Sequence, residues 1–127
     1  MRDLSHNLGV VQAFAPAVYA ATTAGSAIDL LGFDSAMLTI NTGAIAGSGL
    51  YVVSLDESDV SGSGYTAVAA ADMIGTLPAS LAADSVYKVS YIGNKRFVKA
   101  TITKTSGTSI AAGAVIVKGH ASSRPVA

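Results

Sequence analysis

The sequence predicts an all-β fold, a single antiparallel β-sandwich of jelly-roll-like type (residues 18–127) preceded by an N-terminal arm (residues 1–17). Apolar residues alternate with polar ones at a period of two in several short segments, which is typical of strands with one buried face. Gly, Ser and Asn turns separate these segments, and long stretches with helical spacing are missing from the sequence. A chain of 127 residues is long enough for one ordinary domain.

The N-terminal arm has two possible conformations. Four apolar residues recur there at a spacing close to that of a helix: Leu4, Leu8, Val11 and Phe14. Gly9 and the two valines that follow it argue against a stable helix, so an extended arm that docks on a neighbouring molecule fits equally well. In either conformation we expect these four side chains to contact a partner.

Strands are expected throughout the rest of the chain. Their predicted ranges are 17–20, 27–30, 36–42, 50–56, 86–92, 96–103 and 114–120. In four of these strands the alternation assigns one face to the core. The residues on those faces are Ala36, Leu38 and Ile40; Tyr51, Val53 and Leu55; Tyr87, Val89 and Tyr91; and Val98, Ala100 and Ile102.

The connections between strands are predicted from their turn residues. A Gly-rich loop after residue 42 suggests a wide hairpin, and Gly93 to Lys95 suggest a second, tight hairpin between strands 86–92 and 96–103. In the alanine-rich stretch 67–84, a glycine and a proline interrupt any helix. We therefore expect a long crossing loop there, with one short helical turn.

The charges are separated along the chain. All eight acidic residues lie at or before Asp84, whereas seven of the eight basic residues lie at or after Lys88. Charged residues make up 13% of the sequence, about half of the usual ~25%. We expect the basic residues to meet acidic ones, either in the first two-thirds of the same chain or in a neighbouring molecule. The low charge also suggests that a partner covers part of the surface.

The residue types that carry chemistry are sparse. Cysteine is absent, the two histidines lie near opposite ends, and neither a GxSxG elbow nor a P-loop occurs. The acidic run at residues 56–59 lacks the EF-hand pattern, so a solvated turn is favoured over an ion site. No apolar run is long enough to span a bilayer, and the pI near 6.7 argues against nucleic acid. We expect no enzyme activity, cofactor, membrane span or nucleic-acid partner.

Nearly the whole chain resembles a family of small proteins encoded among the head genes of tailed bacteriophages, beside the major capsid protein. The segments that carry this resemblance are 16–19, 27–47, 50–68, 71–103 and 114–127. They consist of strand cores and turns. The resemblance therefore identifies a family rather than an activity.

The resemblance implies a head decoration, or cement, protein that is made in the bacterial cytoplasm and binds the capsid exterior. Its expected partners are the major capsid protein and further copies of itself, with a trimer favoured. The candidate interface residues are Leu4, Leu8, Val11, Phe14, Lys95, Arg96, Lys99 and Arg124. Two alternatives remain: another virion component (a head–tail completion, tail or spike protein) and a carbohydrate-binding β-sandwich module.

Overall fold

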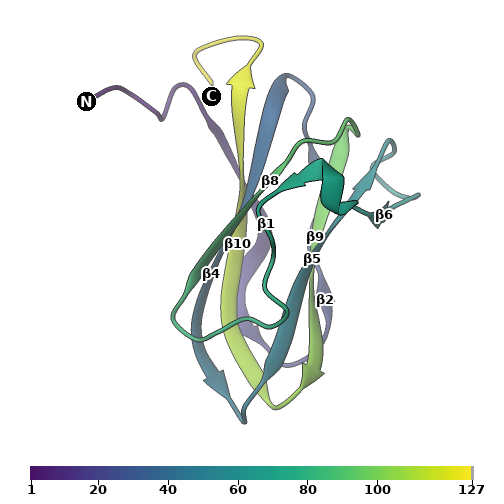
Figure 1. The fold of residues 1–127 in the computed structure, drawn as a ribbon. Helices are drawn as coiled ribbons and strands as arrows, with labels where there is room; N and C mark the ends of the chain where they lie inside the picture. The colour runs from purple at the N-terminus through teal and green to yellow at the C-terminus, as the bar shows by residue number, and fades with distance from the viewer. Residues whose placement is uncertain (127) are drawn as a thin grey trace.

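The computed structural model describes residues 1–126, which form two antiparallel β-sheets packed face to face (Figure 1). The elements in chain order are β1 (Gly9–Tyr19), β2 (Thr23–Ala24), β3 (Ile28–Asp29), β4 (Phe33–Ala46), β5 (Leu50–Ser58), β6 (Thr66–Ala67), the 3-10 helix η1 (Ala70–Asp72), β7 (Met73–Ile74), β8 (Val86–Tyr91), β9 (Phe97–Ser106) and β10 (Ser109–Ala121). The predicted all-β sandwich is confirmed.

The strand order is that of a jelly roll. Sheet A has the order β1-β10-β4-β8-β7, and sheet B has the order β2-β9-β5-β6, with β3 also paired to β9. We count β2 and β3 as two pieces of one strand along β9 and treat β7 as an addition to the edge of sheet A. The eight remaining strands then form the two four-stranded sheets of a jelly roll.

The core lies between the sheets and is built from the alternation in the sequence. The predicted inward residues of β4, β5 and β9 are all buried, as are Val89 and Tyr91 of β8, while Tyr87 packs against them partly buried. Small and β-branched side chains dominate this core. The face assignments made from the sequence are therefore confirmed for these four strands.

Both predicted hairpins are wrong. Strand β8 pairs with β4 and β7 in sheet A, whereas β9 pairs with β5 in sheet B, so the Gly93 to Lys95 connection crosses between the sheets. The Gly-rich connection from β4 to β5 crosses in the same way. Turn residues indicate where a chain reverses, but a hairpin and a crossing between sheets use the same residue types.

The N-terminal arm is shorter than predicted, because residues 9–17 belong to β1. This strand pairs with β10 along the edge of sheet A, with irregularities on either side of Phe14. The spacing that suggested a helix instead places Val11 and Phe14 on the inner face of a bulged strand. The segment that precedes the first strand is residues 1–8.

The middle stretch 67–84 covers the free edge of β5. As predicted, it is a crossing segment with one short helical turn, which is η1. The backbone N–H of Val68 donates to the carbonyl of Leu55, and that of Leu81 donates to the carbonyl of Tyr51 at 2.8 Å. These bonds satisfy backbone groups of β5 that would otherwise be open at the sheet edge.

Candidate functional site

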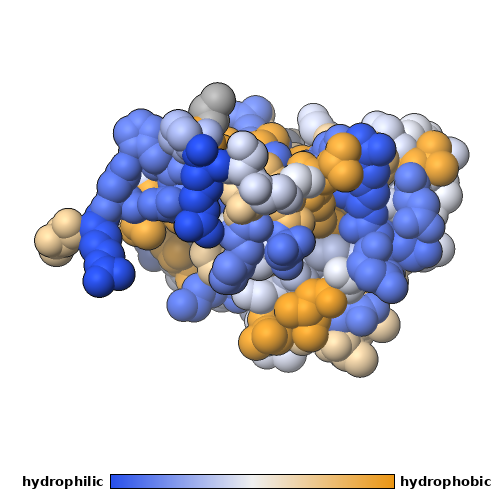
Figure 2. All heavy atoms as spheres, turned by 90° about the horizontal axis from the view of Figure 1, so that it is seen from above, coloured by the Kyte–Doolittle hydropathy of each residue, from blue (hydrophilic) through white to orange (hydrophobic). Residues whose placement is uncertain are grey.

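Both chain ends lie at one end of the sandwich, which we call the loop end (Figure 1). It comprises the segments 1–8, 30–32, 59–65, 92–96 and 122–126, which precede, connect or follow the strands there. Figure 2 looks down on this end and shows a mainly hydrophilic surface with apolar side chains in separate groups. Leu4, Leu31 and Ile92 are among the exposed apolar residues of these segments.

The loop end contains an open groove of about 440 Å³. Residues 30–36 line one side of it and residues 93–96 the other, with Asp59, Tyr91 and Ser122 completing the lining. Acidic, basic and hydroxyl groups are therefore mixed within a few ångströms. Such a surface suits recognition of a partner through paired charges.

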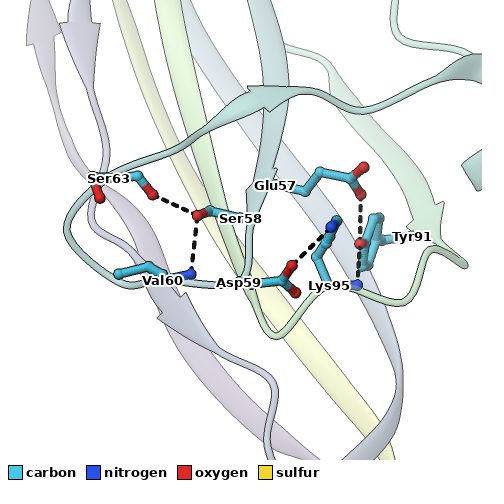
Figure 3. Close-up of polar contacts among 7 residues, drawn as sticks. All are labelled: Glu57, Ser58, Asp59, Val60, Ser63, Tyr91 and Lys95. Carbon is cyan, nitrogen blue, oxygen red and sulfur yellow. Dashed lines mark hydrogen bonds and ion pairs between the residues drawn. The ribbon is translucent and has the colours of Figure 1, made fainter.

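Tyr91 lines this groove, and its hydroxyl forms two hydrogen bonds there (Figure 3). Its hydroxyl donates to Glu57 Oε2 at 2.6 Å and accepts from the backbone N–H of Lys95 at 3.0 Å. Burial, and then the hydrogen bond to Glu57, raise the pKa of Tyr91. A Cβ on Gly93 would lie 2.5 Å from this hydroxyl, so glycine is needed for the loop to pass over the ring. The connection between β8 and β9 is thus fixed to sheet A.

Removing this hydroxyl tests the network. We expect Tyr91→Phe to lower the free energy of unfolding by about 1–2 kcal/mol, because the partly buried Glu57 and the Lys95 amide each lose a partner. Urea unfolding followed by circular dichroism measures the change. Tyr65→Phe is the control, since the Tyr65 hydroxyl donates to the carbonyl of Ser61 in an exposed loop. Equal stabilities for both variants would contradict the role given to Tyr91.

Basic residues of the last third meet acidic residues of the first two-thirds at this end. Lys95 Nζ lies 2.8 Å from Asp59 Oδ2. Arg96 binds Asp29 through two hydrogen bonds, from Nε at 2.9 Å and from Nη2 at 2.8 Å. Lys99 faces Asp56 on the neighbouring strand, and its Nζ lies 4.3 Å from the ring centroid of Tyr65. The chain therefore pairs much of its separated charge internally.

The ion pair between Arg96 and Asp29 makes the stability of the folded protein depend on pH. The hydrogen bond from Arg96 is the main cause that lowers the pKa of Asp29 from 3.8 to about 2. A lowered folded pKa stabilises the protein above the unfolded value, and this contribution is lost as the pH falls through about 2. Both side chains are 40–50% exposed, 41% for Asp29 and 48% for Arg96, so the effect is below about 1 kcal/mol.

We therefore expect Asp29→Asn to be less stable than the parent protein at neutral pH and to converge with it between pH 4 and 2. Thermal unfolding across this range measures the difference. Asp34→Asn, a change at an exposed carboxylate near the start of β4, serves as the control. If the stability difference between Asp29→Asn and the parent protein grew as the pH fell, the prediction would be contradicted.

The acidic run 56–59 is not the predicted turn, because β5 extends through Ser58 and only Asp59 follows it. Glu57 binds the Tyr91 hydroxyl and Asp59 binds Lys95, while Asp56 lies opposite Lys99 in the strand register. Figure 3 shows Ser58 closing the following loop, where its Oγ donates to the Ser63 carbonyl and accepts from the Val60 N–H. Within residues 1–126, no group of three His, Asp or Glu side chains is placed to hold a metal ion.

The predicted interface residues fall into three groups. Leu4 is 67% exposed and Leu8 is partly buried. In β1, Val11 packs partly buried against the core and Phe14 is buried in it. The assignment of the last two to a docking arm is therefore corrected. Lys95, Arg96 and Lys99 lie at or near the loop end in the pairs described above. Arg124 is exposed on the C-terminal segment.

Sequence reasoning missed Tyr91 and Glu57 as partners. It placed Tyr91 on a core face, which is correct, but period-two alternation says nothing about what a hydroxyl at the rim of the core will bind. The two histidines stay apart at this end: His6 contacts Asp3, and His120 Nδ1 lies 2.8 Å from Ser35 Oγ. Of the helical segments in the described part of the chain, none could cross a membrane.

Comparison with known proteins gives little further information. No family model and no curated protein matches the chain. A solved structure of infectious bursal disease virus, Gx strain, aligns with a TM-score of 0.47 and 13% identity over 89% of this chain. The alignment covers 32% of the viral chain, so this protein spans about a third of its length.

Proposed function

We propose that this protein is a structural component of a tailed-phage virion that binds the outside of the head and stabilises the shell. The observation that carries the proposal is the jelly-roll strand order, an architecture used by viral capsid proteins. A fold alone does not define a function. The resemblance of the sequence to phage head proteins supplies the second, independent support.

A cement protein needs a stiff body and exposed contact surfaces, and this chain has features suited to both. The loops at the loop end are tied down by the Tyr91, Lys95 and Arg96 contacts, which lowers the entropy lost on binding. In this proposal the loop end meets the major capsid protein. In this proposal the protein also associates with further copies of itself.

Binding to heads tests the proposal directly. Heads of the encoding phage, assembled without this protein, are mixed with the purified chain and sedimented. We expect saturable binding and a higher temperature for shell rupture. Absence of binding at micromolar concentrations, with the chain folded by circular dichroism, would refute the decoration role. Binding to tails instead of heads would favour another virion component.

A matched pair of variants locates the contact. Arg124→Glu reverses an exposed charge at the loop end, and Lys104→Glu makes the same change near the opposite end of β9. We expect the first to weaken head binding several-fold and the second to leave it unchanged. The opposite ranking would place the shell contact at the other end of the sandwich.

A carbohydrate-binding module is disfavoured by the rings at the groove. Sugar sites present open aromatic faces, but Tyr91 is buried and the Phe33 ring is faced by Lys118 Nζ at 4.5 Å. The sequence also lacks tryptophan. Specific retention of the protein on a glycan array would reverse this preference.

A further inference from the structure

The outer faces of the two sheets differ in chemistry. On sheet B the outward residues include Asp29 of β3, Asp56 of β5 and Lys99 of β9, accompanied by serines and threonines. On sheet A the outward positions of β1, β10, β4 and β8 are mostly aliphatic, small or amide side chains. The sheet A outer face is therefore the least charged broad surface of the described chain.

Strand pairing arranges the sheet A outer face in rows. The first row crosses all five strands and consists of Val10, Val117, Met37, Ser90 and Ile74. The second row consists of Gln12, Val115, Thr39 and Lys88, and the third of Gly113, Asn41 and Val86. Of these residues, Lys88 alone is charged.

The exposure of this face is substantial. Val10 and Ile74, at the two ends of the first row, are 64% and 62% exposed, and Val86 in the third row is 68% exposed. Strand β10 also reads as a continuous apolar run from residue 110 to residue 117. Antiparallel strands with one wet face alternate, whereas continuous apolar runs are typical of strands covered on both faces. The sequence and the structure thus agree that something covers this surface.

We propose that the sheet A outer face binds the same face of a second copy of this chain. A surface whose rows carry one charged residue matches itself better than it matches a charged partner, because such a partner would lose hydration and gain few ion pairs. A contact between identical patches relates two copies by a two-fold axis, so it predicts a dimer in place of the trimer that the resemblance implies. This inference goes beyond the proposed binding to heads and does not depend on it.

The area of the sheet A outer face is large enough for an interface with a second copy of the chain. Four strands about 4.8 Å apart, with about eight residues each at ~3.4 Å per residue, cover roughly 500 Å². Two copies together then bury about 1,000 Å², which is the scale at which specific interfaces begin. A single face of this sandwich therefore supplies enough surface for a pair of modest affinity.

The neighbouring edge of sheet A does not offer an alternative mode of association. Strand β1 contains Pro16 and irregular pairing on both sides of Phe14. The carbonyl of Ala13 already accepts from the Ser26 N–H at 3.1 Å. Proline and bulges on an edge strand prevent the addition of another strand. Copies would therefore meet face to face.

Two exposed positions allow a test that spares the core. Val10→Asp and Val86→Asp place carboxylates on the sheet A outer face, whereas Thr103→Asp places one on the outer side of sheet B as a matched control. Sedimentation equilibrium of the purified chain, without heads, measures association, and circular dichroism checks folding. We expect each valine variant to raise the dissociation constant at least ~100-fold, because a carboxylate would be buried in the contact without a charged partner. The control should associate as the parent does.

Salt separates an apolar contact from a charged one. Raised sodium chloride should leave association of the parent chain unchanged or strengthen it, because screening acts on ion pairs. The proposal is overturned if the parent chain is a monomer, if raised salt dissociates it, or if the valine variants associate normally. If the valine variants associate normally and also fail to bind heads, the sheet A outer face contacts the shell instead of a second copy. Loss of association with head binding retained would support it, whatever the outcome for the loop end.

Discussion

Replacing Gly25 by alanine is expected to lower the free energy of unfolding by roughly 3–5 kcal/mol, a large part of the stability of a small domain. Gly25 lies between β2 and β3, which both pair with β9 in sheet B, at the point where this edge of sheet B contacts β1 of sheet A. Its N–H donates to the Ala100 carbonyl at 2.7 Å. A Cβ there would lie 2.2 Å from the Ala13 carbonyl oxygen and 2.7 Å from that of Ala100.

Both atoms that the new methyl group would clash with are backbone carbonyl oxygens, so no side-chain rotation can relieve the clash. The two sheets would have to separate along this side. Gly62→Ala is the matched control, because a Cβ on Gly62 meets no atom within 4 Å. We expect the control to stay within about 0.5 kcal/mol of the parent chain. Equal urea midpoints for the two variants would contradict the close approach of Gly25 to the backbone of β1 and β9.

Truncation of Tyr51 has the second-largest expected effect. Its side chain is fully buried at the start of β5, and its hydroxyl donates to the carbonyl of Tyr19 at 3.0 Å, with the carbonyl of Thr108 at 3.3 Å. We expect Tyr51→Ala to cost about 3–5 kcal/mol through the cavity it leaves. Tyr51→Phe, which keeps the ring, should cost about 1–3 kcal/mol because buried carbonyls lose their donor.

The pair of variants separates packing from hydrogen bonding. Urea unfolding at neutral pH measures both free energies, and similar slopes against urea would show that the change lies in stability. If Tyr51→Phe were as damaging as Tyr51→Ala, the hydroxyl and not the ring volume would be the main contribution. If neither variant changed stability, Tyr51 would not lie at the centre of the core.

The elements of the fold are predictable from the sequence because they follow from local alternation. In β5, Tyr51, Val53 and Leu55 recur at every second position, and all three are buried. The same reasoning succeeded for β4 and β9. It failed for β1, where bulges around Phe14 break the period and create a spacing that imitates a helix.

The pairing of strands was not predictable from local signals. Strand β8 is followed by Gly93 and Asn94, which a hairpin would use equally well, yet the next strand joins the other sheet. Whether β9 pairs with β8 depends on whether the edges of β8 are already paired with other strands. In sheet A, β8 already has β4 on one side and β7 on the other. Only the assembled fold contains that information.

The sequence predicted that acidic and basic residues would pair at the candidate site, but it did not predict which residues would be partners. The separation of acids from bases along the chain indicated that they would pair, and Arg96 with Asp29 is such a pair. The particular partners depend on the meeting of loops that are far apart in sequence. The sheet A outer face had a signal in the unbroken apolar run of β10, which the initial strand assignment, starting at residue 114, took in only in part.

We propose that this chain is a rigid structural protein whose outer surfaces bind other virion subunits. The most direct test is an image reconstruction of the intact phage particle that encodes it. The account predicts density for a jelly roll on the exterior of the head, with the loop end toward the shell. A complete particle that lacks this density on its head would contradict the account.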